Sequence, residues 1–140
     1  MTTESVHRNV TVQRIANGQF TVTNARGGRI TFGGGETDFS PVELLLAAIG
    51  GCTAIDVDIV TSRRAEPDAF EVLVDAEKVR DEAGNHLTDI EVTFRIAFPG
   101  GTQGDEARAV LPDIVQKSHD RLCTVSRTVE LGTPIATRIE

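Results

Sequence analysis

Residues 40–56, SPVELLLAAIGGCTAID, decide how this chain folds. The first four residues predict a helix start, because Ser40 can accept a hydrogen bond from the backbone N–H of Glu43 and the Glu43 carboxylate can accept one in return. Pro41 suits the first helical position, where its missing N–H does no harm. We therefore expect a helix that runs to about Ser62. Its middle is apolar nearly all round, which is typical of a helix that is buried on most sides.

Two glycines, Gly50 and Gly51, stand directly before the first cysteine, Cys52. Each glycine costs about 1 kcal/mol relative to alanine in a helix interior, so their presence needs a reason. We expect them to let a second helix, or a partner subunit, reach the sulfur of Cys52. Free cysteine is also among the most buried residue types, so a purely packing role is an alternative for both Cys52 and the second cysteine, Cys123.

The flanking sequence predicts an α+β fold in the order βββ-α-ββ-α-β, as one domain over residues 1–140. Asn17-Gly18 predicts a two-residue hairpin between the first two strands. Alternating apolar and polar residues predict two long antiparallel strands after the helix, since one face then meets the core and the other meets water. The expected later elements are strands near 70–76 and 90–98, a second helix from about Gly104 with a kink or restart at Pro112, a helical turn at 124–129 and a last strand at 135–139.

Composition narrows the class of protein. The formal net charge of −7 disfavours nucleic-acid binding, because an acidic surface repels phosphates. The N-terminal residues are polar, and the longest apolar run, Leu44–Ile49, is too short to cross a bilayer. Two cysteines are too few for a secreted disulfide scaffold. We expect a soluble cytoplasmic protein with no nucleic-acid or membrane partner.

Two motifs carry a resemblance to a known family. The segment from Ser40 to Asp56 resembles the first-cysteine helix of the osmotically inducible protein C (OsmC) superfamily, and Leu122-Cys123-Thr124-Val125-Ser126 resembles its second-cysteine motif. The expected order of strands and helices matches that of the superfamily from about residue 9 to the end. The GGC-[ST]-AID motif is most similar to that of the OsmC-like branches. The resemblance implies an intertwined homodimer, with antiparallel sheets packed on two central helices and both cysteines near the subunit interface.

The resemblance also implies an activity. Well-studied branches, including the organic hydroperoxide resistance proteins, reduce peroxides with a cysteine pair. Carried over to this chain, Cys52 is the peroxidatic cysteine and Cys123 the resolving one, with an external dithiol as reductant and no cofactor or metal. The apolar helix predicts a pocket that favours organic hydroperoxides over hydrogen peroxide.

Only a thiolate is a good nucleophile, and Cys52 lies too far along its helix for the dipole to act on it. We therefore expect a fixed cation beside it. In the hydroperoxide-resistance branch a carboxylate directly follows the helix-start proline and orients an activating arginine from the first hairpin. This chain has Val42 there and Glu43 one position later, so Glu43 is a candidate catalytic residue. The candidate cations are Arg14, Arg26, Arg29 and Arg127.

Two alternatives to the peroxidase remain open: a non-catalytic protein that binds a small apolar ligand at the dimer interface, and a structural disulfide. The glutathione pool of the cytoplasm argues against the disulfide. His119 and Asp120 near Cys123 are interpreted as a polar helix end rather than a cysteine–histidine pair. Asp56, one turn after Cys52, is expected to oppose formation of the thiolate unless it is paired.

Overall fold

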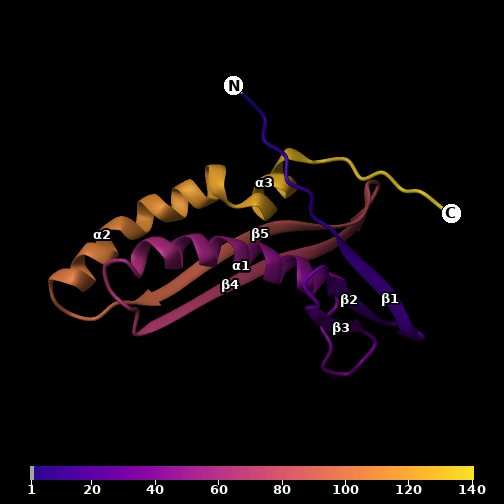
Figure 1. Ribbon diagram of the computed structural model, residues 1–140, viewed down its shortest axis with the longest axis horizontal. Coiled ribbons are helices and arrows are strands. Elements are labelled where there is room, and N and C mark those ends of the chain that lie inside the picture. Colours follow the sequence, from indigo (N-terminus) through magenta and orange to yellow (C-terminus); the bar gives the residue numbers. More distant parts are fainter. Residues whose placement is uncertain (1) are drawn as a thin grey trace. The chain divides into compact units, whose positions relative to one another are not determined.

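The computed structural model describes residues 2–140 (Figure 1). The chain divides into two compact units, one that ends at Leu45 and one that runs from Leu46 to Glu140. Each unit has its own antiparallel sheet. The α+β class predicted from the sequence is confirmed.

The first unit contains a three-stranded sheet in the order β1-β2-β3, formed by β1 (Val10–Ala16), β2 (Gln19–Asn24) and β3 (Arg29–Gly33). Its first turn is the predicted Asn17-Gly18 hairpin, and Gly18 takes a φ of 72°, which glycine adopts without strain. The hairpin prediction is therefore confirmed.

The helix α1 (Pro41–Thr61) begins at the predicted capping box. The Glu43 N–H donates to Ser40 Oγ at 3.1 Å, and the Ser40 N–H donates to Glu43 Oε1 at 2.9 Å. At the other end, the Arg64 guanidinium donates to the carbonyl of Val60 at 3.0 Å and so satisfies one of the last free carbonyls. Both ends of α1 lie close to where the sequence places them.

The second unit is built on a long hairpin of β4 (Ala69–Asp81) and β5 (Gly84–Ala97). The strands pair antiparallel around a two-residue turn, so they are longer than the sequence pattern alone predicts. Half-buried and exposed residues alternate along β4, as its period-two pattern requires. Figure 1 shows α1 and α2 (Thr102–Lys117) on the same side of this hairpin.

After α2 the chain forms one turn of π-helix, η1 (Ser118–Leu122), and then a short helix, α3 (Thr124–Leu131). The helix α2 runs through Pro112 without the predicted restart, since Ala107 and Ile114 are buried on either side of the proline and hold the helix in place. A core cluster packs α2 against the end of β5 and the loop after α1: Ala65, Phe98 and Ala107, with Ile96 and Leu111 packed against them.

Two sequence expectations are wrong. The predicted last strand at Ile135–Ile139 is irregular chain, with Ile135 93% and Ile139 95% exposed, because no strand among the described residues pairs with it. The helix α1 is also not buried on most sides: within the chain, Ile55 is 62% and Ile59 is 50% exposed. A strand needs a partner and an apolar helix face needs a cover, and neither requirement is visible in a local pattern.

The whole helix α1 is long and apolar enough to cross a membrane. The uninterrupted apolar run Leu44–Ile49 within it is too short to do so. The same test is passed by core helices of soluble proteins, so it does not by itself indicate a membrane span.

Candidate thiol site

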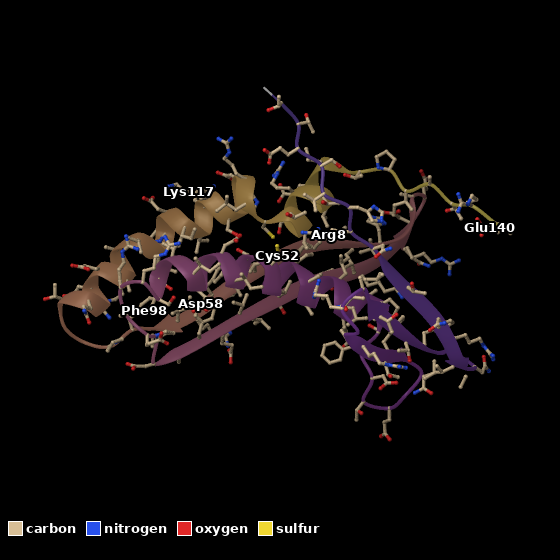
Figure 2. All side chains as sticks on the ribbon, in the orientation of Figure 1. Arg8, Cys52, Asp58, Phe98, Lys117 and Glu140 are labelled. Atoms are coloured by element: carbon tan, nitrogen blue, oxygen red, sulfur yellow. The ribbon has the colours of Figure 1, made fainter. Side chains whose placement is uncertain are left out.

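The second unit brings Cys52 and Cys123 together. Cys52 lies on α1 and is partly exposed, whereas Cys123 stands between η1 and α3 and is completely buried. Both are free thiols. Hydrogen bonding to the side chain of Cys123 acts on the Cys52 thiol, so the two sulfurs are neighbours although they are far apart in the sequence. Figure 2 shows Cys52 on the side of α1 that faces α3.

The N-terminus of α3 meets both sulfurs. Cys123 is the N-cap of α3, and its Sγ accepts a hydrogen bond from the Ser126 N–H at 3.4 Å while its thiol donates to Ser126 Oγ at 3.2 Å. The backbone N–H of the preceding residue, Val125, lies close enough to Cys52 to lower the pKa of its thiol. N–H groups in the first turn of a helix have no partner within the helix and favour negative charge, so this helix end suits a thiolate.

The π-helical turn η1 sets the position of Cys123. The Cys123 N–H donates to the Ser118 carbonyl at 2.8 Å, five residues back, which is the wider bond of a π-helix. One extra residue in the turn lets the chain leave α2 and start α3 at Cys123. Single π-turns of this kind are frequent at functional sites.

A buried polar cluster ties η1 to α1 beside Cys52. Ser118 Oγ donates to Asp56 Oδ2 at 2.8 Å and lies 2.7 Å from Thr53 Oγ1. Since the single Ser118 proton goes to Asp56, Thr53 is the donor to Ser118. Ser118 is fully buried and Thr53 is 6% exposed. The cluster therefore links α1, which carries Cys52, to the turn η1, which directly precedes Cys123.

The pKa of the Cys52 thiol is raised above its ordinary value. Burial is the largest cause, and the neighbouring Cys123 and the negative charge of Asp56 raise this pKa further, while the Val125 N–H lowers it. Among the described residues, the main influences on this pKa include no cation. The activating cation expected beside Cys52 stays a prediction, because three of its candidates lie in the first unit, whereas the expected opposition from Asp56 is confirmed.

The sequence-predicted partners of Cys52 have other contacts. Arg127 on α3 pairs with Glu130 at 3.3 Å. Glu43 uses its carboxylate in the capping box at the start of α1. The remaining candidate cations lie in the first unit: Arg14 on β1, Arg26 in the turn after β2 and Arg29 on β3.

Gly50 and Gly51 serve different purposes. A Cβ on Gly50 would lie 2.7 Å from Val74 Cγ2, so Gly50 allows α1 to approach β4. A Cβ on Gly51 would meet nothing within 4 Å. The expectation that both glycines allow close approach of the second helix is therefore wrong for Gly50, whose neighbour is the strand β4. Gly51 faces open space within this chain.

A cavity of about 520 Å³ is formed by α1, β5, α2, η1 and α3; neither cysteine lines it, but Thr53, the residue after Cys52, does. Half of its lining residues are aliphatic or aromatic: Ile49, Ile90, Val92, Phe94, Val115 and Val129. Two of its polar lining residues, Thr53 and Ser126, are the residues bonded to Ser118 and Cys123. No local pattern in the sequence marks this cavity, because five elements contribute to it.

His119 also lines this cavity, and the sequence reading of it as a simple polar helix end missed its partners. Its Nδ1 lies 2.8 Å from Asp120 Oδ1, and its Nε2 lies 2.8 Å from Glu130 Oε1. The bond to Asp120 is the main cause that raises the pKa of His119, with a further contribution from Glu130. The described residues contain no group of three or more His, Cys, Asp or Glu side chains that could hold a metal ion.

Comparison with known proteins shows which family and fold this chain shares. Protein YhfA of Escherichia coli K12 is 32% identical over 115 residues, which cover 80% of this chain and 81% of YhfA. The fold is similar to an OsmC-like protein of Vibrio cholerae, with a TM-score of 0.72 at 14% identity over 90% of this chain and 95% of that one.

It is also similar to the organic hydroperoxide resistance protein OhrB of Bacillus subtilis, with a TM-score of 0.52 at 19% identity over 88% of this chain and 90% of that one. The resemblance noted in the sequence is confirmed, since the family model described as OsmC-like protein matches residues 33–138. The chain belongs to the OsmC-like protein family.

Proposed function

We propose that this protein is a thiol-dependent peroxidase that reduces organic hydroperoxides as part of oxidative-stress defence. The observation that carries the proposal is the meeting of Cys52 and Cys123 at the N-terminus of α3, beside a largely apolar cavity. The family supports it, because one structural neighbour, OhrB, is an organic hydroperoxide resistance protein.

In the proposed reaction the Cys52 thiolate attacks the outer oxygen of the hydroperoxide. The O–O bond breaks, Cys52 becomes a sulfenic acid, and the alkoxide takes a proton and leaves as the alcohol. The Cys123 thiol then displaces water from the sulfenic acid to form a disulfide. An external dithiol reduces the disulfide and is itself oxidised, which returns both cysteines to thiols.

With this arrangement we expect the Cys52 thiol to react slowly with peroxide at neutral pH and faster as the pH rises. The raised pKa of Cys52 leaves a small thiolate fraction, and the Val125 N–H is the group that favours this fraction. The aliphatic and aromatic walls of the cavity favour alkyl and aryl hydroperoxides over hydrogen peroxide. No bound cofactor enters any of these steps.

The test is peroxide consumption by the reduced protein with cumene hydroperoxide and an excess of dithiothreitol. We expect turnover by the wild type and none by Cys52→Ser. We expect Cys123→Ser to react once and to leave a sulfenic acid on Cys52 that dimedone labels. If the wild type consumes peroxide no faster than Cys52→Ser with several dithiols, the proposal fails.

A second candidate is the binding of a small apolar ligand without catalysis. It is favoured by the raised pKa of Cys52, which keeps the thiol protonated, and by the cavity of about 520 Å³. A fluorescent apolar probe should then bind the wild type, and Val129→Glu, which places a charge in the cavity wall, should abolish the binding. Wild-type turnover of cumene hydroperoxide would favour the peroxidase instead.

We further propose that this small soluble protein acts as a homodimer in the cytoplasm. The exposed face of α1, formed by Ala48, Gly51, Ile55 and Ile59, leaves apolar surface uncovered within the chain. Residues three and four apart lie on one helix face, so these side chains form a single strip, and the open space at Gly51 allows close approach of a second helix. The cytoplasm also supplies the dithiol reductants that the reaction requires.

A further inference from the structure

We propose that His119 is a positioning residue of the thiol pair: through Glu130 it holds the N-terminus of α3 against Cys52 and Cys123. This inference rests on the proposed role of the two cysteines as a reactive pair. Among the described residues, the hydrogen-bond partners of His119 are Asp120 and Glu130 and not the two sulfurs. Its effect on the sulfurs is therefore through the placement of α3.

Two consecutive residues of η1, Ser118 and His119, have side chains that reach different helices. Ser118 bonds to Asp56 and Thr53 on α1, in the buried cluster. His119 bonds to Glu130 near the end of α3 at 2.8 Å. The turn η1 is therefore tied to the helix that carries Cys52 and also to the helix that offers its N–H groups to both sulfurs.

The helix α3 is only weakly held by burial of its own side chains. All of its residues are exposed or partly exposed, and none is buried. A helix of eight residues is too short to be stable alone in water, so its place depends on its contacts. Its contacts to η1 are the N-cap at Cys123 and the bond from His119 to Glu130, one at each end of the helix.

The charge of His119 decides whether it can donate to two carboxylates at once. A protonated imidazole can donate from both ring nitrogens, and His119 has a carboxylate at each: Asp120 at Nδ1 and Glu130 at Nε2. A neutral imidazole has one N–H and can serve only one of them. The other groups around it are Gln116 on α2, which donates to Asp120, Arg127 on α3, which pairs with Glu130, and, across the cavity from β5, Glu91.

The sign of the pH effect follows. The two carboxylates raise the pKa of His119, so the bridge is fully formed at pH below the ordinary histidine value and is lost as the pH rises through the raised value. Loss of the bridge should loosen α3 and withdraw the Val125 N–H from Cys52. The thiolate of Cys52 would then be less favoured than its own titration alone predicts.

The test measures the rate at which iodoacetamide alkylates Cys52, by mass spectrometry, between pH 5.5 and 9. The pKa of His119 is measured in parallel by NMR. For the wild type we expect the logarithm of the rate to rise with pH, and to bend below unit slope at the pKa of His119. For Glu130→Gln we expect no bend, and a rate about three-fold below the wild type at the acid end, where the bridge is otherwise intact.

Glu106→Gln is the matched control, because it makes the same change on an exposed residue of α2 outside the bridge. It should behave as the wild type does. A wild-type profile without a bend at the pKa of His119, or a Glu130→Gln profile equal to that of the wild type, would overturn the proposal. If Glu130→Gln does not fold, as judged by circular dichroism, the presence or absence of the wild-type bend decides.

The alkylation needs no peroxide and no dithiol turnover. If the wild type shows the bend but does not consume cumene hydroperoxide, the His119 bridge is supported and the proposed peroxidase activity is refuted. If the wild type consumes the hydroperoxide but its alkylation profile has no bend, the proposed peroxidase activity is supported and the His119 bridge is refuted.

Discussion

Thr53 and Ser118 share a hydrogen bond of 2.7 Å between their side-chain oxygens, inside the protein, although 65 positions separate them in the chain. The Ser118 hydroxyl in turn donates a hydrogen bond to Asp56. This contact connects the helix that carries Cys52 to the turn that positions Cys123, and it is the most buried polar link near the two thiols.

Ser118→Ala should destabilise the protein and slow closure of the disulfide. The change leaves the Thr53 hydroxyl and Asp56 without their partner, and an unsatisfied buried group costs about 1–3 kcal/mol. Urea unfolding gives the stability, and gel shifts of the oxidised protein give the rate of closure. Ser62→Ala, on the partly exposed residue after α1, is the control and should change neither. An unchanged midpoint for Ser118→Ala would contradict the role of the buried cluster.

Gly50→Ala should be less stable than Gly51→Ala by more than about 1 kcal/mol. The new methyl group at Gly50 would press on Val74, whose branched side chain has little freedom to move away, whereas the same group at Gly51 meets open space within the chain. Alanine at Gly51 also gains helix propensity. Thermal unfolding of the two variants measures the difference, and equal losses would show that both glycines are packed alike.

Asp56→Asn should speed alkylation of Cys52 near neutral pH. The Asp56 carboxylate raises the pKa of Cys52, so removing its charge lowers that pKa and increases the thiolate fraction. Asparagine can still accept the bond from Ser118, which keeps the buried cluster. Asp58→Asn, on an exposed residue of the same helix, serves as the control. The reading fails if the two variants alkylate at the same rate.

Glu43→Gln should leave peroxide consumption within about two-fold of the wild type, since glutamine also completes a capping box. Ser40→Ala should instead cost about 0.5–2 kcal/mol of stability, because it removes the cap. A catalytic carboxylate at Glu43 would show itself differently. In that case Glu43→Gln would lower the turnover with cumene hydroperoxide by about 100-fold or more without loss of stability.

Ile55→Asp should convert the proposed homodimer to a monomer. The charge falls in the centre of the exposed apolar strip of α1, where a partner helix would have to bury it. Light scattering after size-exclusion chromatography gives the mass. Gln103→Glu adds the same charge at an exposed position of α2 and should leave the mass unchanged. A wild type that is monomeric at micromolar concentration would remove the basis for the dimer.

The sequence by itself determined the local elements and the family. The capping box at Ser40 and Glu43, the Asn17-Gly18 hairpin and the alternation along β4 each depend on residues within a few positions of one another, so a pattern suffices to predict them. The motifs around Cys52 and Cys123 were enough to indicate an OsmC-like fold. Where a prediction needed a distant partner, as for the last strand at residues 135–139, it was wrong.

Only the tertiary structure decided what surrounds the cysteines. It placed the N-terminus of α3 at both sulfurs, the β4 strand beside Gly50, and the Ser118 cluster between α1 and the turn that precedes Cys123. It also gave the direction of the Cys52 pKa, which burial raises. Burial and electrostatic neighbours are sums over residues from many parts of the chain, and no window of sequence contains them.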